Sequence, residues 1–209
     1  VKECLRHGIK ACEEYPAFRE GGSSDFKEMC QRLAKHSKED DYRYIYAYYD
    51  EYDSLMHQDG PNGKKSDAYL RYVNEEICNL SQAISKDTMI VVTADHGQIP
   101  IEKTINIKNS EFDHYLYRPP TLEQRCMAFY VKEEYKEIFA KRFKEEFEED
   151  FILLTHQQVL ETKLFGPREN HPRFEEMIGD YLAIAKTNAV FLYQDPSAPF
   201  PLKGQHAGS

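Results

Sequence analysis

An acid and an imidazole lie side by side in this 209-residue sequence, shortly after an apolar run. The run, residues 88–92, has the composition of a buried strand, and Asp95 and His96 follow it. Open α/β sheets bind their ligands at the carboxyl ends of the strands. Carboxylate oxygen and neutral imidazole nitrogen are ligands for Zn²⁺, with Mn²⁺ or Fe as alternatives on ligand type alone. The pair is therefore a candidate for metal binding.

A second acid and imidazole, Asp53 and His57, follow another strand-like run at residues 42–49. A third imidazole, His206, lies in a glycine-containing segment close to the last residue. A hydrolase that uses two metal ions needs carboxylates and imidazoles that arrive from several loops at one edge of a sheet. Together these side chains predict a metal site divided between several segments.

Each of these groups also has a structural interpretation. Asp95 precedes a glycine-containing turn and would serve equally well as a helix cap, and Asp53 with His57 is a common combination in polar loops. Each pair, however, directly follows an expected strand. Their joint occurrence favours the metal site, because structural context is what confirms a motif.

The elements between the two pairs have the order strand, helix, strand. Residues 42–49 are aromatic and β-forming without alternation, as in a central strand covered on both faces. Residues 53–63 are rich in turn formers, and Ser66 is expected to cap a helix that leads to a strand at residues 88–94. This order predicts parallel strands with a right-handed crossover, so that both pairs reach the same sheet edge. The apolar face of the helix comprises Tyr69, Val73, Ile77, Leu80 and Ile84.

The remaining elements follow from apolar periodicity and capping signals. A helix is expected to begin at the N-cap Ser24, and residues 99–125 are expected to form a small excursion. Residues 181–185 and 189–193 are expected to form a hairpin, preceded by a turn at Gly179. Further helices are predicted at residues 1–7, 133–149 and 155–164, the last with a Thr155/Gln158 capping box, and further strands at residues 9–15, 127–131 and 151–154.

Composition limits the classes of function. A hydrophobic content of 41% over 209 residues is that of a globular protein with a sizeable core. A net charge of −9 with dispersed basic residues opposes binding to a nucleic-acid polymer. No apolar run reaches the roughly 20 residues that cross a bilayer, so no membrane partner is expected. The cysteines form no Cys-x-x-Cys pair and indicate reduced thiols; they are Cys4, Cys12, Cys30, Cys78 and Cys126.

Three motifs, in this order and with these approximate separations, resemble the alkaline phosphatase superfamily and within it the type I phosphodiesterase/nucleotide pyrophosphatase branch. The resemblance extends from Tyr44 to the end of the chain. Ala207 stands where the family usually has glycine. The motifs are Asp53-Ser-Leu-Met-His57-Gln-Asp-Gly60-Pro61, Val91-Val-Thr-Ala-Asp95-His96-Gly97 and Lys203-Gly-Gln-His206-Ala-Gly208.

The resemblance implies a three-layer α/β/α sandwich with a mostly parallel central sheet, incomplete at the N-terminus. Residues 1–209 would form the C-terminal part of the catalytic core. It implies a binuclear site in which Asp53, His57 and His206 bind one divalent ion. Asp95 and His96 would bind the second ion, whose ligand set is incomplete in this chain. Zinc is the first choice for both ions. The family's Thr or Ser nucleophile has no match here and is expected upstream of Val1, so no catalytic residue is identified.

The implied activity of the intact protein is metal-dependent hydrolysis of phosphodiester or pyrophosphate bonds in a small phosphorylated substrate, with a nucleotide as one candidate. This chain alone is expected to be inactive. One alternative is a phosphomonoesterase, phosphonate hydrolase or phosphomutase of the same superfamily, and another is a non-catalytic metal-binding or structural domain. The cysteine usage favours the bacterial cytoplasm, with a signal peptide upstream of Val1 as the alternative. The oligomeric state has no signal in the sequence.

Overall fold

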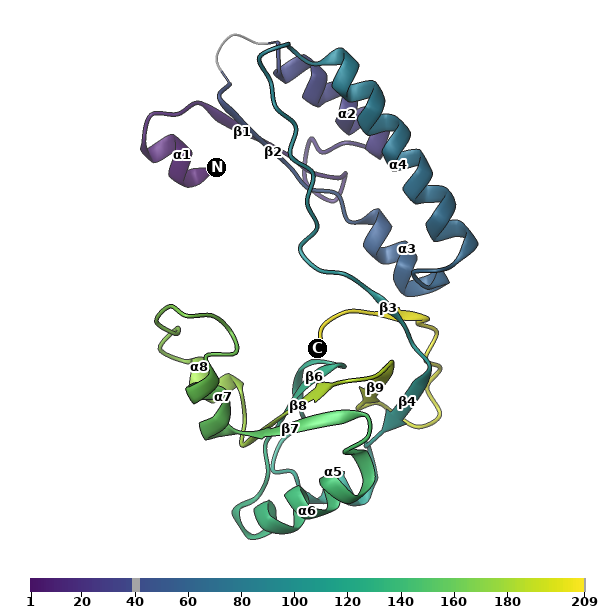
Figure 1. Cartoon of the computed structure of the whole chain (residues 1–209), viewed down its shortest axis with the longest axis vertical. Helices are drawn as coiled ribbons and strands as arrows, with labels where there is room; N and C mark the ends of the chain where they lie inside the picture. The colour runs from purple at the N-terminus through teal and green to yellow at the C-terminus, as the bar shows by residue number, and fades with distance from the viewer. Residues whose placement is uncertain (39–41, 209) are drawn as a thin grey trace. The chain divides into compact units, whose positions relative to one another are not determined.

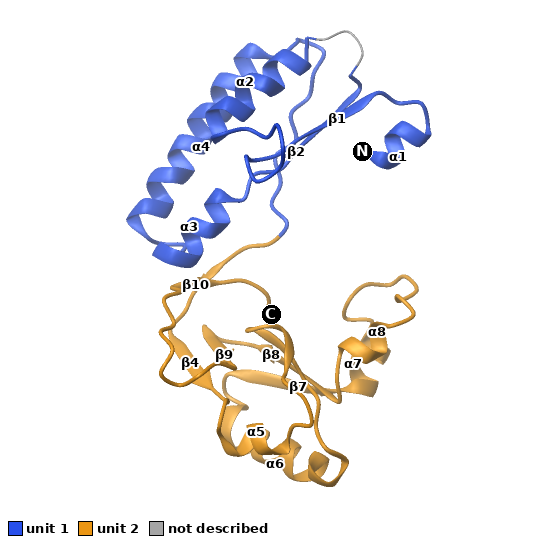
Figure 2. Ribbon diagram, turned by 180° about the vertical axis from the view of Figure 1, so that it is seen from behind, with its two compact units in different colours: residues 1–95 blue, residues 96–209 orange. Residues whose placement is uncertain are grey.

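The structure is a computed structural model that describes residues 1–38 and 42–208. Helices and strands both contribute, which confirms the mixed α/β class. The chain divides into two compact units, unit 1 (residues 1–95) and unit 2 (residues 96–209) (Figure 2).

Unit 1 is built around a parallel pair of strands, β1 and β2, joined by helix α2. Helix α4 packs against both α2 and α3 (Figure 1). This βαβ unit brings the carboxyl ends of β1 and β2 to one edge, from which the chain enters α3. The elements are α1 (Lys2–Arg6), β1 (Ala11–Glu14), α2 (Phe26–His36), β2 (Tyr44–Ala47), α3 (Glu51–Asp59) and α4 (Lys64–Ala83).

The N-termini of α2 and α4 are capped differently from expectation. In α2 the cap is Asp25, whose side chain accepts from the Glu28 amide at 2.7 Å, and not Ser24. In α4 the cap position is Gly63, and Asp59 accepts from the Lys65 amide at 2.8 Å. The prediction that Ser66 is the cap was therefore wrong, since this residue lies inside the first turn.

Residues 53–63 were expected to form a loop, but Glu51–Asp59 form the helix α3. The segment contains no glycine or proline before Gly60, whose positive φ of 86° ends the helix. The neighbouring strand also differs from expectation, because β2 pairs only with β1 within the described chain and Tyr44 and Tyr46 are exposed. The prediction of a central strand covered on both faces was wrong for this structure.

Residues 88–94 were expected to form a buried strand. In the described chain they form no strand, and the side chains of Met89 and Val91 are 83% and 74% exposed. An apolar run acquires strand geometry only when a neighbouring strand satisfies its backbone groups, and none pairs with this segment. The segment leads to Asp95 and His96, where the chain passes from unit 1 to unit 2.

Unit 2 contains one antiparallel sheet of four strands in the order β5-β6-β8-β7 and two shorter pairs. Parallel pairing is confined to β4 with β9 here, and β3 pairs with β10 in the antiparallel sense. The predicted hairpin of residues 181–193 was wrong, because β8 pairs with β6 and β7 whereas β9 pairs with β4. The strands are β3 (Ile99–Pro100), β4 (Lys103–Asn106), β5 (Thr121–Glu123), β6 (Cys126–Phe129), β7 (Phe151–Thr155), β8 (Tyr181–Ala185), β9 (Ala189–Leu192) and β10 (Gly204–Gln205).

Helices cover both faces of this four-stranded sheet. Alternate residues of β8 point to opposite faces, so Ala183 packs in a phenylalanine-rich cluster with α6 and Leu182 packs with Val159 of α7. The Thr155/Gln158 capping box at the start of α7 is confirmed. The helices are α5 (Glu111–Tyr115), the short 3₁₀ helix η1 (Glu133–Tyr135), α6 (Lys136–Phe147), α7 (His156–Thr162) and α8 (Phe174–Met177).

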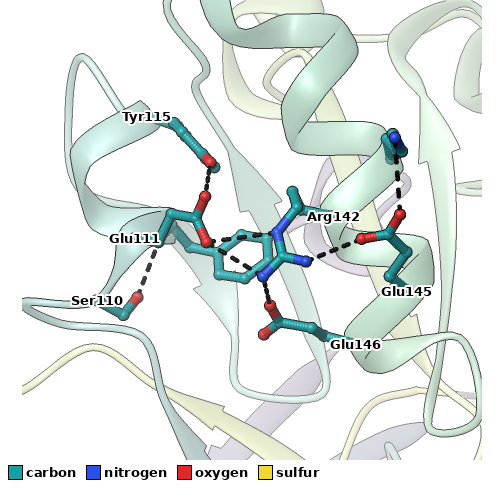
Figure 3. Close-up of polar contacts among 8 residues, drawn as sticks. Ser110, Glu111, Tyr115, Arg142, Glu145 and Glu146 are labelled. Carbon is teal, nitrogen blue, oxygen red and sulfur yellow. Dashed lines mark hydrogen bonds and ion pairs between the residues drawn. The ribbon is translucent and has the colours of Figure 1, made fainter.

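A polar cluster joins α5 to α6 (Figure 3). Arg142 donates to Glu111 at 3.3 Å and to Glu145 at 2.9 Å, and it also contacts Glu146. The Tyr115 hydroxyl donates to Glu111, which lowers the pKa of that carboxyl, while Glu111 raises the pKa of Tyr115 to about 12. Since these charged groups are solvent-exposed and screened, the cluster orients the two helices and adds little stability.

None of the helices in the described residues is long and apolar enough to cross a membrane.

Candidate metal centre

Asp53 and His57 lie one turn apart on α3, so their side chains project from the same face of the helix. The Nε2 atom of His57 is 3.5 Å from Oδ2 of Asp53, and both side chains are partly buried. A carboxylate and an imidazole at this spacing on a helix can approach the same ion. The helix thus fixes Asp53 and His57 in a geometry that suits chelation of one ion. A flexible loop would not fix this geometry.

Negative charge gathers around Tyr48, between β2 and α3. The pKa of Tyr48 is raised, first by burial and then by the carboxylates of Asp95, Asp50 and Asp53. Within unit 1, Asp53 and Asp95 therefore lie close enough to act on one phenol. Carboxylate oxygens together with the imidazole nitrogen of His57 are donor types that fit a divalent metal.

In unit 2 the ladder between β3 and β10 brings two imidazoles together. Gln205 pairs with Ile99, which places His206 beside the segment that begins at His96. The rings of His96 and His206 are stacked, with centroids 4.1 Å apart and planes inclined by 30°. The stacked pair thus brings two imidazoles, which are common ligands of divalent metals, next to each other in unit 2.

The predicted ligands therefore form two local groups. Unit 1 holds Asp53, His57 and Asp95, and unit 2 holds the stacked pair of His96 and His206. The boundary between the units falls inside the Asp95–His96 motif.

Side chains that no sequence motif indicates contact the His206 segment. The His206 amide donates to Oε1 of Gln205 at 3.0 Å, and Nε2 of Gln205 donates to Oε1 of Gln124 at 2.6 Å. Nε of Arg125 donates to the Ala207 carbonyl at 2.7 Å. Gln124 and Arg125 form the turn between β5 and β6, and no local sequence pattern connects that turn to a segment so distant in the chain.

The chain is thus an α/β protein with paired carboxylates and imidazoles. A family model for type I phosphodiesterase / nucleotide pyrophosphatase matches residues 10–208, and the chain belongs to this family. No curated protein matches the chain significantly.

Solved structures show the same fold. Murine ectonucleotide pyrophosphatase/phosphodiesterase 5 is 17% identical with a TM-score of 0.71, over 98% of this chain and 58% of that chain. Phosphonoacetate hydrolase from Sinorhizobium meliloti 1021, in complex with phosphonoformate, is 14% identical with a TM-score of 0.65, over 98% and 63% of the two chains. An inactive variant of the murine protein is in complex with AMP. The chain therefore spans about three fifths of the length of these neighbours.

The residue after His206 has a backbone conformation that favours glycine, because φ of Ala207 is +61°. We expect Ala207→Gly to stabilise unit 2 by about 0.5–1 kcal/mol, since relief of the left-handed strain exceeds the entropy gained by the unfolded chain. Denaturant unfolding measures the difference. Ala140→Gly inside α6 is the control and should destabilise by about 1 kcal/mol. An unchanged or lower free energy of unfolding for Ala207→Gly would contradict the claim that Ala207 is strained.

Proposed function

We propose that the intact protein hydrolyses phosphodiester or pyrophosphate bonds with the help of two divalent metal ions. The observation that carries the proposal is the presence, in a chain matched to the family over residues 10–208, of a carboxylate and an imidazole on one face of α3. The stacked imidazoles of unit 2 are the second support. Both units would belong to one catalytic core.

Asp53, His57 and His206 are proposed to bind one ion, and Asp95 with His96 the other. Zinc is the first choice for this mixture of imidazole and carboxylate, with Mn²⁺ or Fe as alternatives. When bound, the ions would supply Lewis acidity, lowering the pKa of a nucleophilic hydroxyl and of water and neutralising charge on the phosphoryl group. The side chains of this chain would bind the ions and orient them.

The nucleophile is proposed to be a Thr or Ser outside residues 1–209, so that this chain alone does not turn over substrate. Residues 1–52 contain no match to the family's nucleophile segment, and the chain spans 58% of the murine neighbour. The substrate is proposed to be a small phosphorylated compound such as a nucleotide, in line with the AMP complex of that neighbour. A bacterial cytoplasmic location is proposed from the reduced cysteines alone.

The ligand assignment predicts the outcome of zinc titration. We expect the wild-type chain to bind zinc, and His57→Ala or His206→Ala to weaken binding at their site by more than about 100-fold, which exceeds the usual effect of an outer-shell change. His171→Ala is the matched control, because His171 is exposed and its Nδ1 accepts from the Arg173 amide. Competition titration with a chromogenic chelator measures the affinities. Equal effects of His171→Ala and His57→Ala, or the absence of zinc binding, would refute the assignment.

Activity measurements separate the alternatives. Hydrolysis of bis-p-nitrophenyl phosphate by the intact protein, faster than that of p-nitrophenyl phosphate, supports a diesterase, and the reverse order supports the monoesterase alternative. The neighbouring phosphonoacetate hydrolase makes phosphonoacetate the third substrate to compare. A zinc-dependent rate from the 209-residue chain, lost in His57→Ala, would refute the external nucleophile while leaving the metal site standing.

A further inference from the structure

Arg125 is a buried cation. Within the described chain, the hydrogen bonds of its guanidinium go to backbone carbonyls. Its side chain belongs to the turn between β5 and β6, and the residue is 3% exposed. Burial lowers the pKa of the guanidinium, so its N–H groups must be matched by acceptors in the protein. Three carbonyl oxygens accept hydrogen bonds from its Nε and Nη1 atoms. Burial of a guanidinium costs free energy, and the β5–β6 hairpin itself does not require a charged side chain at this position. The contacts of Arg125 with other segments therefore indicate its role.

One of these carbonyls belongs to the residue next to His206. Nε of Arg125 donates to the oxygen of Ala207 at 2.7 Å. Gly208 lies directly against the same guanidinium, because a Cβ built on Gly208 would be 2.7 Å from Nη2 and 3.1 Å from Cζ of Arg125. The side chain thus contacts the two residues that follow His206 and holds Ala207 in its left-handed conformation.

The other two carbonyls anchor the guanidinium to the sheets. Nη1 donates to the oxygen of Thr187 at 2.5 Å and to that of Ala189 at 3.2 Å, which lie between β8 and the start of β9. The planar fork of arginine directs its donors outward in fixed directions, which allows one side chain to join two separate segments. A lysine ammonium at the same position would not reach both with this geometry.

A second link works in parallel. The side chain of Gln205 bridges Gln124, the neighbour of Arg125, to the backbone amide of His206, through bonds of 2.6 Å and 3.0 Å. The β5–β6 turn therefore holds the His206 segment on both sides of the histidine. The β3–β10 ladder, which has two residues on each strand, also aligns the His206 segment with Ile99 and Pro100.

We propose that Arg125 is a positioning residue for the metal centre: its guanidinium fixes residues 206–208 to the sheets of unit 2 and so orients the His206 imidazole beside His96. The inference rests on the proposed function, in which His206 is a metal ligand. Arg125 acts through the backbone of the segment, and its own nitrogens bind carbonyls and no ion. Without the guanidinium, the His206 imidazole would still be present, but its orientation would no longer be fixed.

Zinc affinity and amide hydrogen exchange of the full chain test this role. We expect Arg125→Met and Arg125→Lys each to weaken zinc binding by about 10–100-fold, the range for groups that orient a ligand. In the metal-free chain, the same variants should exchange the amides of residues 205–207 about tenfold faster, while the amides of β6, β7 and β8 keep their protection.

Thr187→Val is the matched control. It removes the hydrogen bond of 2.7 Å from the Thr187 hydroxyl to Asp150 and loosens the β8–β9 connection, but it leaves the backbone carbonyl available to Arg125. We expect this variant to match the wild type in zinc affinity and in exchange at residues 205–207. An effect equal to that of Arg125→Met would refute a specific role for the guanidinium.

The outcomes separate this inference from the proposed function. If the wild type binds zinc and Arg125→Met binds it equally well, the inference is refuted and the ligand assignment stands. If the wild type binds no zinc, the ligand assignment fails, and unchanged exchange at residues 205–207 in the variants would refute the anchoring as well. Should Arg125→Met unfold, Arg125→Lys decides, because it keeps the positive charge and loses the planar fork that joins Ala207 to Thr187 and Ala189.

Discussion

Replacement of Phe191 by alanine is expected to destabilise unit 2 by about 3–5 kcal/mol, the cost of a large cavity in an aromatic core. Phe191 lies on β9 and is fully buried. Its ring stacks on Phe151 with centroids 4.0 Å apart, and it meets Phe129 and Phe147 edge to face at 5.7 and 5.2 Å. These partners come from three other elements, so the surroundings cannot collapse around the missing ring without moving the sheets.

The measurement is denaturant unfolding followed by near-ultraviolet circular dichroism, which reports the aromatic packing. Phe165→Ala is the matched control, since Phe165 is 49% exposed and contacts only Phe174 among the ring pairs described. Its loss should cost less than about 1 kcal/mol. A Phe191→Ala variant no less stable than the Phe165→Ala variant would show that β9 is not held by this cluster.

Replacement of Gly179 by alanine is expected to destabilise unit 2 by about 2–4 kcal/mol. Gly179 has φ of +66°, and a Cβ built on it would lie 2.5 Å from the carbonyl oxygen of Phe129. That oxygen belongs to the sheet backbone and accepts the Asp180 amide at 2.8 Å, so it has no freedom to withdraw. Left-handed strain of roughly 1–2 kcal/mol and an overpacking cost of similar size add together.

Gly8→Ala separates the backbone strain from the overpacking cost. Gly8 has a similar φ of +71° but nothing within 4 Å of its virtual Cβ, so it carries only the conformational strain. Unfolding of each variant, measured for the unit that contains it, should give a loss of about 1–2 kcal/mol for Gly8→Ala and a larger loss for Gly179→Ala. Equal losses would mean that the contact with Phe129 relaxes.

Elements with strong local signals were predictable from the sequence. The capping box at Thr155 fixes the start of α7 through two short-range bonds, and its sequence signature lies within four residues. Strands β6 and β7 and helix α6 agree with their apolar patterns for the same reason. Such features need no knowledge of the rest of the chain.

Elements that depend on distant partners were not predictable. The runs at residues 181–185 and 189–193 are correctly strands, but their order in the sheets is set by β4, β6 and β7, which a sequence pattern does not reveal. Residues 88–94 have strand composition and no pairing partner in the described chain. The helix α3 was missed because glycine at 60 and proline at 61 suggested a turn throughout, when they mark only its end.

The candidate site shows the same division. Residue types and spacing nominate Asp53, His57, Asp95, His96 and His206 as ligands, because the motifs that contain them are local, and this assignment stays a prediction. The contact of Arg125 with Ala207, which we propose orients His206, was not recognised, because it spans 82 positions of sequence. A buried arginine in a hairpin turn has no distinguishing sequence signature until its acceptors are known.

The β3–β10 ladder has a kinetic consequence. It joins the two ends of unit 2 through two residue pairs, and the bridge from Gln124 to Gln205 spans 81 positions, so the loop-closure entropy is large and the local contacts are few. Contacts of such high sequence separation form after local ones during folding. We therefore expect the stacked histidines to be among the last contacts of unit 2 to form, after the four-stranded sheet.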